Sequence, residues 1–421
     1  MISNRRRFMA GAAVTAAFGG FALRAQGQAK QETYRNEVYG YGPLQADPYG
    51  ILDLPAGFSY QVVSQAGETM DDGLLAPQNA DGMGCFGLDG DRVILVRNHE
   101  LKATDINRGP LGLGRHLAEK LDRRRAYDVD DGGFPLPGGT STMVYDLKAR
   151  KLVSQHLSLA GTAVNCAGGV TPWGSWLTCE ETTITAGRGG KKDHGYVFEV
   201  PARAKGLVDP NPIKEMGRFQ HEAAAVDPRT GVIYLTEDSF DSKGLFYRFL
   251  PNDRTKPHKG GKLQAMGVRE TPQGGDVRNF KGEPVTWTPG SWQDVVWIDL
   301  EGIDNPHDDL RFRGQTAGAA FVGRGEGIFM GKDGLYFTAT SSGPAGNGQV
   351  LKYVPSPHEG QAGEKDAPGC LQLFVEPTDD RVLDYADNLA IAPWGHIFAC
   401  EDRYSDVDRN HVKAITPEGK V

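Results

Sequence analysis

Short apolar runs, bounded by turn residues and ending on acidic side chains, recur along the chain and predict β-hairpins. The central copy reads NCAGGVTPWGSWLTCEE at residues 165–181, with a turn at Pro172-Trp173-Gly174 between its two runs. Comparable copies begin at Glu222, Glu326 and Asp387. One type of hairpin is therefore repeated along most of the chain.

Repetition of this hairpin at intervals of roughly 50 to 100 residues indicates a radially repeated β-architecture. We therefore predict an all-β protein, a β-propeller, whose blades bring the same hairpin position to one axis. A looser copy, LDGDRVILVRNHE, ends at Asn98-His99-Glu100. Two stretches lack the pattern and predict insertions near residues 102–135 and 251–292. The first contains a helical pattern over residues 115–127, and the second is expected to be a long loop.

Composition agrees with a turn-rich β-fold, because the 421 residues include 56 Gly and 25 Pro. A repeat fold of this length can form one domain with a large core. The formal net charge of -8 gives no basic surface for nucleic acid, which excludes that class of partner. The five Cys are scattered and odd in number, so they do not form a disulfide framework.

The N-terminus predicts a twin-arginine export signal over residues 1–29, since Asn4-Arg5-Arg6-Arg7-Phe8 precedes a weakly apolar run. An ordinary secretory signal with an arginine-rich start is the alternative. Residues 30–421 would then form a single propeller domain. No later segment approaches the roughly 18 apolar residues that span a bilayer. We expect a periplasmic or secreted protein, a monomer, with the twin-arginine translocase as its partner during export.

Two columns of polar side chains appear when the turn glycines of the copies are superposed. The first column contains Cys166, Glu222, Glu326 and Asp387. The second, 14 or 15 residues later, contains Glu180, Glu237, Thr340 and Glu401. Like charges converging on one axis cannot all stay ionised in a desolvated channel unless cations fill it. The columns predict a metal site; the alternative is that the acids cap strands at an exposed rim.

Cys166 stands where the other copies have a carboxylate, which favours a metal ligand over a disulfide with Cys179 or an inert thiol. A thiolate among carboxylates selects a transition metal, whereas all-oxygen positions suit Ca²⁺. Arg324 lies two residues before Glu326, so both side chains share one face of an extended strand. Its guanidinium could form a surface salt bridge or grip a phosphate oxyanion.

Five ordered motifs resemble the PhoX-type alkaline phosphatases over nearly all of the mature chain. They are Arg-Asn-His-Glu at 97–100, Asn-Cys-Ala-Gly-Gly at 165–169 with Thr-Cys-Glu-Glu at 178–181, His-Glu at 221–222, Arg-Gly-Glu-Gly at 324–327, and Ala-Asp-Asn-Leu at 386–389 with Cys-Glu-Asp at 400–402. The resemblance implies hydrolysis of small-molecule phosphate monoesters outside the cytoplasm. It also implies a six-bladed propeller whose channel holds ferric (Fe³⁺) and Ca²⁺ ions with a bridging oxo group.

By motif position, the resemblance assigns a role to each predicted site residue. It implies iron ligands at Cys166, Glu222 and Glu326, mainly Ca²⁺ ligands at Glu100, Glu180, Glu237, Asp387 and Glu401, and a phosphate-binding residue at Arg324. Cys166, Glu326 and Arg324 are then the expected catalytic residues. A multi-metal centre neutralises the phosphate dianion and supplies the attacking oxygen, so no protein nucleophile is needed.

Two departures from the family pattern change the expectation. The chain stops at Val421 without the further Ser-Pro-Asp-Gly strand segment. Either the sequence is a fragment with an incomplete last blade, or the N-terminal strand closes that blade alone. Thr340 replaces a carboxylate, so that quadrant should offer one ligand fewer. Two alternatives remain: a Ca²⁺-stabilised propeller that binds a ligand or partner without catalysis, and a Ca²⁺-dependent hydrolase of the lactonase or phosphotriesterase type.

Overall fold

A computed structural model describes residues 33–403 and 409–421, so the predicted export signal lies outside the described residues. The chain divides into two compact units, which meet in the sequence at Val62 and Val63. The described part of the first unit contains one small antiparallel pair, β1 (Leu44–Gln45) and β2 (Leu54–Pro55). The Asp47 carboxylate organises the turn between them by accepting hydrogen bonds from the Ile51 amide and the Tyr60 hydroxyl.

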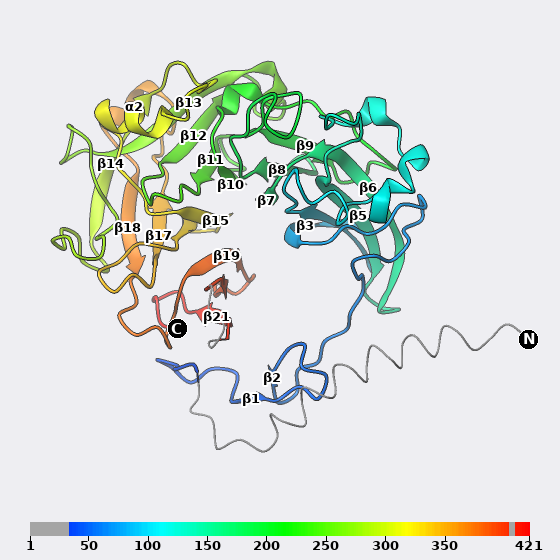
Figure 1. The fold of residues 1–421 in the computed structure, drawn as a ribbon. Coiled ribbons are helices and arrows are strands. Elements are labelled where there is room, and N and C mark those ends of the chain that lie inside the picture. Colours follow the sequence, from blue (N-terminus) through cyan, green and yellow to red (C-terminus); the bar gives the residue numbers. More distant parts are fainter. Residues whose placement is uncertain (1–32, 404–408) are drawn as a thin grey trace, which may run out of the picture. The chain divides into compact units, whose positions relative to one another are not determined.

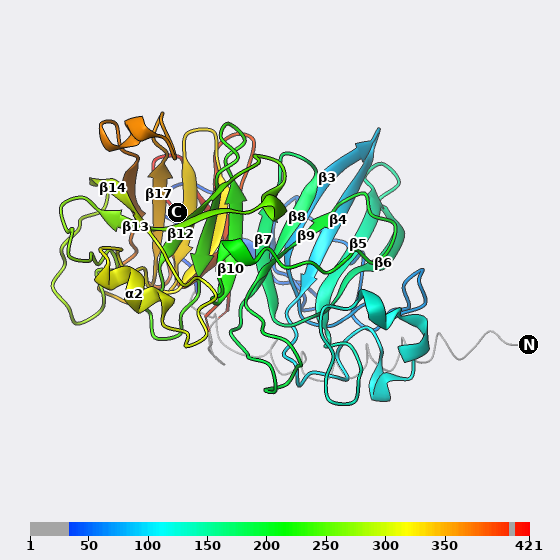
Figure 2. The ribbon, with the colours of Figure 1, turned by 90° about the horizontal axis from the view of Figure 1, so that it is seen from above.

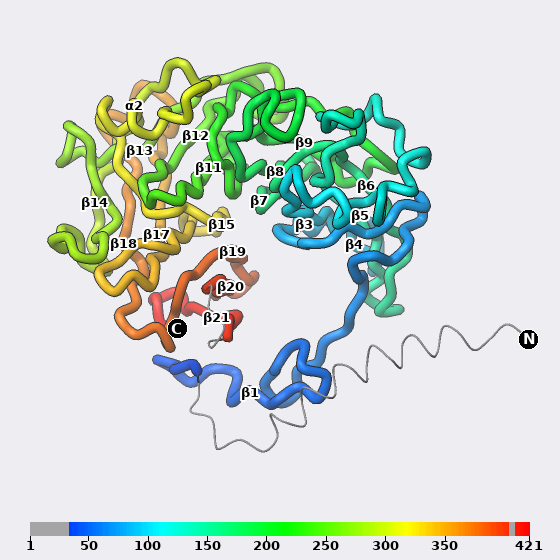
Figure 3. Tube along the Cα trace, in the orientation of Figure 1, coloured from blue at the N-terminus to red at the C-terminus, as the bar shows by residue number. Residues whose placement is uncertain are grey.

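The second unit is built from antiparallel sheets (Figure 2), and in all of them except the largest the strands follow one another in chain order. One sheet has four strands: β3 (Ala80–Asp89), β4 (Arg92–His99), β5 (Gly138–Asp146) and β6 (Lys151–Thr162). A second has three: β7 (Asn165–Val170), β8 (Ser175–Glu180) and β9 (Val197–Pro201). Another three-stranded sheet ends the chain (Figure 3): β19 (Ala386–Ile391), β20 (Ile397–Glu401) and β21 (Val412–Ile415).

The largest sheet has nine strands and consists of two four-stranded meanders joined by a bridging strand. The first meander is β10 (His221–Val226), β11 (Ile233–Glu237), β12 (Phe246–Pro251) and β13 (Gly261–Val268). The second is β15 (Gly325–Met330), β16 (Leu335–Ala339), β17 (Gln349–Val354) and β18 (Cys370–Val375). The bridge, β14 (Trp292–Asp299), pairs with β13 on one side and β18 on the other. The edge strands β10 and β15 lie side by side, so the sheet nearly closes on itself.

The first strands of the successive hairpins are neighbours in space (Figure 1). They follow the order β3, β7, β10, β15 and β19, each in contact with the next. Apolar side chains fill the space between the meanders; for example, the rings of Phe246 and Phe337, from the two meanders of the nine-stranded sheet, stack with centroids 4.3 Å apart, and both are fully buried. Burial of such rings is the main favourable contribution to folding. The core thereby fixes the inner strands relative to one another.

The all-β prediction is confirmed, with two local corrections. The helix predicted over residues 115–127 is instead three single-turn 3-10 helices, Leu113–Arg115, Ala118–Lys120 and Arg123–Arg125. The pattern breaks because Leu121 is extended and Asp122 caps a new turn by accepting from the Arg124 amide.

The prediction of a long loop over residues 251–292 was wrong for Gly261–Val268, which form β13. Glycine and polar residues in β13 mask the apolar pattern that would identify it as a strand in the sequence. The strand is nevertheless mostly buried, because it lies between β12 and β14. Other short helices are Lys214–Met216, Pro257–Lys259, Ala362–Lys365 and α2 (Leu310–Thr316). Within the described residues no helix has both the length and the apolar character needed to cross a membrane.

Candidate metal centre

The first column of the sequence lies in a β-bulge that recurs at the same place in five hairpins of the described chain. In each hairpin two residues of the first strand oppose one residue of the second. Such a bulge bends the strand and redirects a side chain. The bulged pairs are Asp81-Gly82, Cys166-Ala167, Glu222-Ala223, Glu326-Gly327 and Asp387-Asn388.

Small residues after these acids allow neighbouring strands to approach closely. A Cβ atom placed on Gly82 would lie 2.6 Å from the Cα atom of Ala167, and one on Gly327 would lie 2.6 Å from the Cα atom of Asn388. Real Cβ atoms do not come so close to backbone, so both positions require glycine. The close approach brings the bulged side chains of adjacent strands together.

Three overlapping groups of these side chains could each hold a metal ion. Within each group the potential ligand atoms lie within 4.8 Å of one another. The groups are Asp81-Glu100-Cys166, Cys166-Glu181-Glu222 and Glu222-Glu326-Asp387. Five of the predicted ligands, Glu100, Cys166, Glu222, Glu326 and Asp387, are therefore brought together, and Asp81 and Glu181 join them.

The structure does not bring Glu180, Glu237 and Glu401 into these groups. Oε1 of Glu180 lies 2.6 Å from Nδ1 of His194, and Oε2 of Glu401 lies 2.7 Å from Nδ1 of His411. Glu237 accepts hydrogen bonds from the Tyr247 hydroxyl, at 2.7 Å, and the Leu245 amide. These three carboxylates thus connect strands within their own sheets.

The difference follows from strand alternation, since adjacent side chains point to opposite faces. Asn165, before the bulge, pairs with Glu180, so the following residue, Glu181, reaches the metal groups. The corresponding inner position of the β15–β16 hairpin is Thr340, whose hydroxyl donates to Oε1 of Glu326 at 2.9 Å. This agrees with the prediction from the sequence that Thr340 leaves this hairpin with one carboxylate fewer than the other hairpins.

Glu222 shows how strongly the cluster requires a cation. It is fully buried, and neither of its carboxylate oxygens has a hydrogen-bond partner among the described residues. Burial and the nearby Glu326 and Glu181 carboxylates raise its pKa well above the ordinary value. Burial and Asp81 likewise raise the pKa of Asp387 to about 8. A buried, unpaired carboxylate is costly, whereas metal coordination satisfies both its charge and its lone pairs.

Cys166 and Cys179 are both free thiols in the structure, so the hairpin carries no disulfide. Burial and the Glu222 carboxylate raise the pKa of Cys166 well above its ordinary value. A thiol in such an acidic environment becomes a thiolate when a metal ion binds it. The donor set therefore fits the metal type predicted for a mixed thiolate and carboxylate site.

Arg324 lies at the edge of the cluster and pairs with two of its acids. It forms a two-pronged ion pair with Asp238, and its Nη2 atom lies 3.3 Å from Oε1 of Glu326. These contacts raise its pKa against the opposing effect of burial. Its backbone is in the left-handed region, with φ of 54°. The guanidinium is thus fixed in place with permanent positive charge.

Side chains opposite three of the bulges hold the carbonyl group of a bulged residue in the next hairpin of the series. Asn98 donates to the Cys166 carbonyl oxygen at 3.0 Å, and Thr236 donates to that of Glu326 at 2.5 Å. Thr338 donates to the Asp387 carbonyl oxygen at 2.7 Å. We call these three residues the bridging set. They fix the strands of Cys166, Glu326 and Asp387 to the preceding hairpin.

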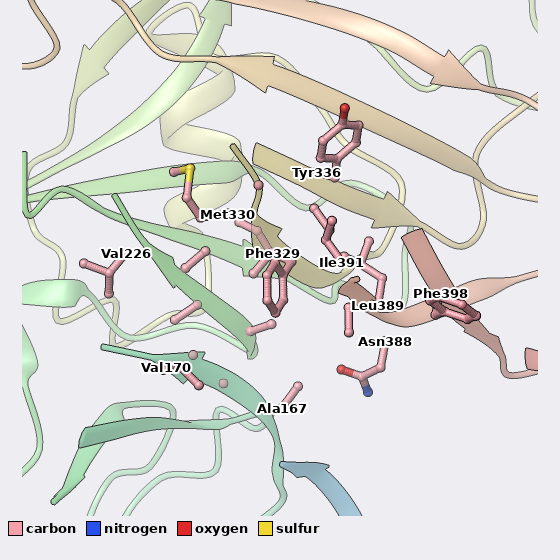
Figure 4. Close-up of a pocket in the computed structure, with 18 of the residues that line it drawn as sticks. Ala167, Val170, Val226, Phe329, Met330, Tyr336, Asn388, Leu389, Ile391 and Phe398 are labelled. Carbon is pink, nitrogen blue, oxygen red and sulfur yellow. The ribbon is translucent and has the colours of Figure 1, made fainter. Parts of the chain in front are cut away.

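A cavity of about 1470 Å³ extends along the inner strands from Asp81 toward the hairpin turns. Figure 4 shows its apolar lining, which includes Val170, Phe329 and Ile391. Arg324 lies at the opposite end of β15, because it precedes that strand whereas Phe329 is near its end. Arg324 therefore lies away from the apolar end of the cavity, whereas Asp81 both lines the cavity and belongs to a candidate metal group.

These features define an all-β protein with a buried, acidic cluster, a candidate metal centre, assembled from repeated hairpins. The model of the alkaline phosphatase PhoX family matches residues 39–145 and 136–421. The chain belongs to this family, and it is accordingly a phosphoric monoester hydrolase of the alkaline phosphatase class, with small-molecule phosphate esters as its substrates. No curated protein matches the chain in sequence.

Two solved structures that resemble the chain differ in how closely they match, and only the first is similar enough to show the fold. Pseudomonas fluorescens PhoX, solved in complex with vanadate, a transition state analogue, is 18% identical, with a TM-score of 0.58 over 86% of this chain and 85% of that chain. A putative 6-phosphogluconolactonase from Bacteroides uniformis is 12% identical, with a TM-score of 0.32 over 80% of this chain and 85% of that chain.

Proposed function

We propose that this phosphatase hydrolyses phosphate monoesters at a centre containing iron and calcium, in the channel of an exported β-propeller. The observation that carries the proposal is Glu222, a fully buried carboxylate with two unpartnered oxygens beside a thiol and further acids. An all-protein environment of this kind is unfavourable without cations. Bound metal ions would supply Lewis acidity and an activated oxygen for attack on phosphorus.

The chemistry of the donor atoms supports separate sites for iron and for calcium. Cys166 and Glu222, with Glu326, would hold iron, because a thiolate favours a transition metal. Glu100 and Asp387 would contribute mainly to calcium sites, together with Asp81 and Glu181, because hard cations prefer oxygen ligands. Glu180, Glu237 and Glu401 would stabilise the strands that carry the ligands, since their carboxylates have protein partners.

Arg324 would bind the phosphoryl oxygens. Its Nε and Nη2 groups donate to Asp238, which orients the plane of the guanidinium beside the metal groups. Arginine presents five N–H donors, so an oriented guanidinium can grip an oxyanion while it keeps its ion pair. Asp238 would thus act on the substrate through Arg324.

The architecture and location complete the proposal. The consecutive contact of five first strands in the described chain supports a propeller, and the likeness to a PhoX structure agrees with it. A sixth blade, a monomeric state, export by the twin-arginine translocase and a periplasmic or secreted location remain predictions from the sequence.

Elemental analysis combined with turnover tests the proposal. Protein exported through its own leader should contain iron and calcium and hydrolyse 4-nitrophenyl phosphate, and chelation should abolish turnover. Cys166→Ala should lose iron while it retains calcium and the fold. Calcium alone without turnover would refute the iron centre and favour a binding propeller.

A further inference from the structure

Phe240 exposes its ring beside Arg324. The side chain is 72% exposed, and the guanidinium carbon of Arg324 lies 5.3 Å from the ring centroid. This distance is within the range of a cation–π contact. The same guanidinium pairs with Asp238 and Glu326, so the ring stands next to the acidic cluster.

The loop that carries Phe240 is well fixed on both sides of the ring. Asp238, Ser239 and Ser242 are buried, and the Ser242 amide donates to the Ser239 carbonyl at 2.7 Å. The Ser239 hydroxyl donates to Asp241 at 2.6 Å. These hydrogen bonds hold the loop in one conformation, so the Phe240 ring has a defined position.

Exposure of one large apolar side chain is common on protein surfaces and by itself indicates nothing. Phe240 differs because its position is fixed relative to the proposed phosphate-binding guanidinium. With a phosphoryl group on Arg324, the alcohol part of the ester would be within reach of the exposed ring, because the guanidinium carbon lies 5.3 Å from the ring centroid. The ring offers that part an apolar, planar surface.

We propose that Phe240 determines substrate preference by packing against the planar or apolar leaving group of a phosphate monoester. The proposal rests on the proposed function, in which Arg324 binds the phosphate. It assigns this enzyme to esters of aromatic or heteroaromatic alcohols, and to nucleotides, in preference to esters of small polyols. Phe240 contributes binding and takes no part in the bond-breaking step.

Kinetics of Phe240→Ala on two substrates test the proposal. KM for 4-nitrophenyl phosphate should rise by about 2- to 10-fold, the factor expected from loss of one aromatic contact. KM for glycerol 3-phosphate and kcat for both substrates should change by less than about twofold, because the metal groups are untouched. Phe240→Trp should retain the preference for the aryl ester.

Trp394→Ala is the matched control, since Trp394 is a 62% exposed aromatic residue that lines the cavity near the hairpin turns. It should leave both KM values unchanged. Unchanged KM values for both substrates in Phe240→Ala would overturn the inference. An equal rise of both KM values would also overturn it, because it would show that the ring only orders Arg324. Absence of turnover by the metal-loaded wild-type protein would instead reject the proposed centre.

Discussion

Adjacent acids on one strand end have different surroundings and, we infer, different roles. Glu237 is bound by the Tyr247 hydroxyl and a backbone amide, whereas its neighbour Asp238 pairs with Arg324. Glu180 lies against His194, whereas Glu181 belongs to a metal group. The chemical type of a side chain therefore does not identify a ligand; its face on the strand does.

Substitution of one member from each pair separates the two roles. Glu181→Gln should lower metal affinity by more than about tenfold. Loss of a residue that only hydrogen-bonds to a metal ligand already lowers affinity by about that factor, and Glu181 is proposed as a ligand itself. Glu237→Gln should leave the metal content unchanged and reduce the free energy of unfolding by about 1 kcal/mol, since the amide oxygen still accepts hydrogen bonds. Metal analysis and urea unfolding of both variants measure these effects. Equal metal loss in both would contradict the assignment.

At the scale of the element, the sequence predicted the hairpins and the first column because turn residues and apolar runs are local signals. It placed the second column on Glu180 and not Glu181 because a bulge changes the register without an obvious sequence mark. Asp81 was missed as a ligand for the same reason. A Gly or Ala follows four of the five bulged side chains, as in Asp81-Gly82 and Cys166-Ala167, and this signal could have revealed Asp81.

Residues of the bridging set should tune the metal site through the backbone. Thr236 contacts two ligand strands at once, since its hydroxyl accepts from the Ala223 amide and donates to the Glu326 carbonyl. Thr236→Val keeps the shape and should cost about 1–3 kcal/mol of stability by leaving buried groups unpaired. It should also weaken metal binding, and Thr236→Ser should restore it, as measured by metal titration.

Thr171→Val provides a control for this prediction. Thr171 is also buried and hydrogen-bonded, to the Ser175 hydroxyl at 2.8 Å, but it lies in the hairpin turn. Its loss should reduce stability without altering metal affinity. If both valine variants weaken metal binding equally, the bridging set has no special influence on the ligands.

At the scale of the whole molecule, the centre joins strands that are distant in the sequence. Asp81 and Asp387 come from opposite ends of the second unit. Burial raises the pKa of both carboxyls, and the Asp81 charge raises that of Asp387 further. Near neutral pH the folded chain without metal therefore favours the protonated form of Asp387, whereas the unfolded chain favours the ionised form. Metal binding and folding should consequently be coupled.

Removal of metal should make stability depend strongly on pH. The pKa of Asp387 rises from 3.8 to about 8 on folding, so the resulting loss of stability is absent below pH 3.8 and grows until about pH 8. The melting temperature of chelated protein should fall between pH 5 and pH 8, and that of metal-loaded protein should change less. Asp387→Asn should flatten the curve of the chelated protein. A flat curve for chelated wild type would disprove the coupling.

The bridging strand β14 has a mechanical consequence. It pairs with β13 on one side and β18 on the other, so a continuous ladder connects the meander that carries Glu222 with the one that carries Glu326. Neither meander can be peeled away without breaking that ladder. Under force or partial denaturation the two should yield as one cooperative block, and the two carboxylates should be lost from the centre in a single event.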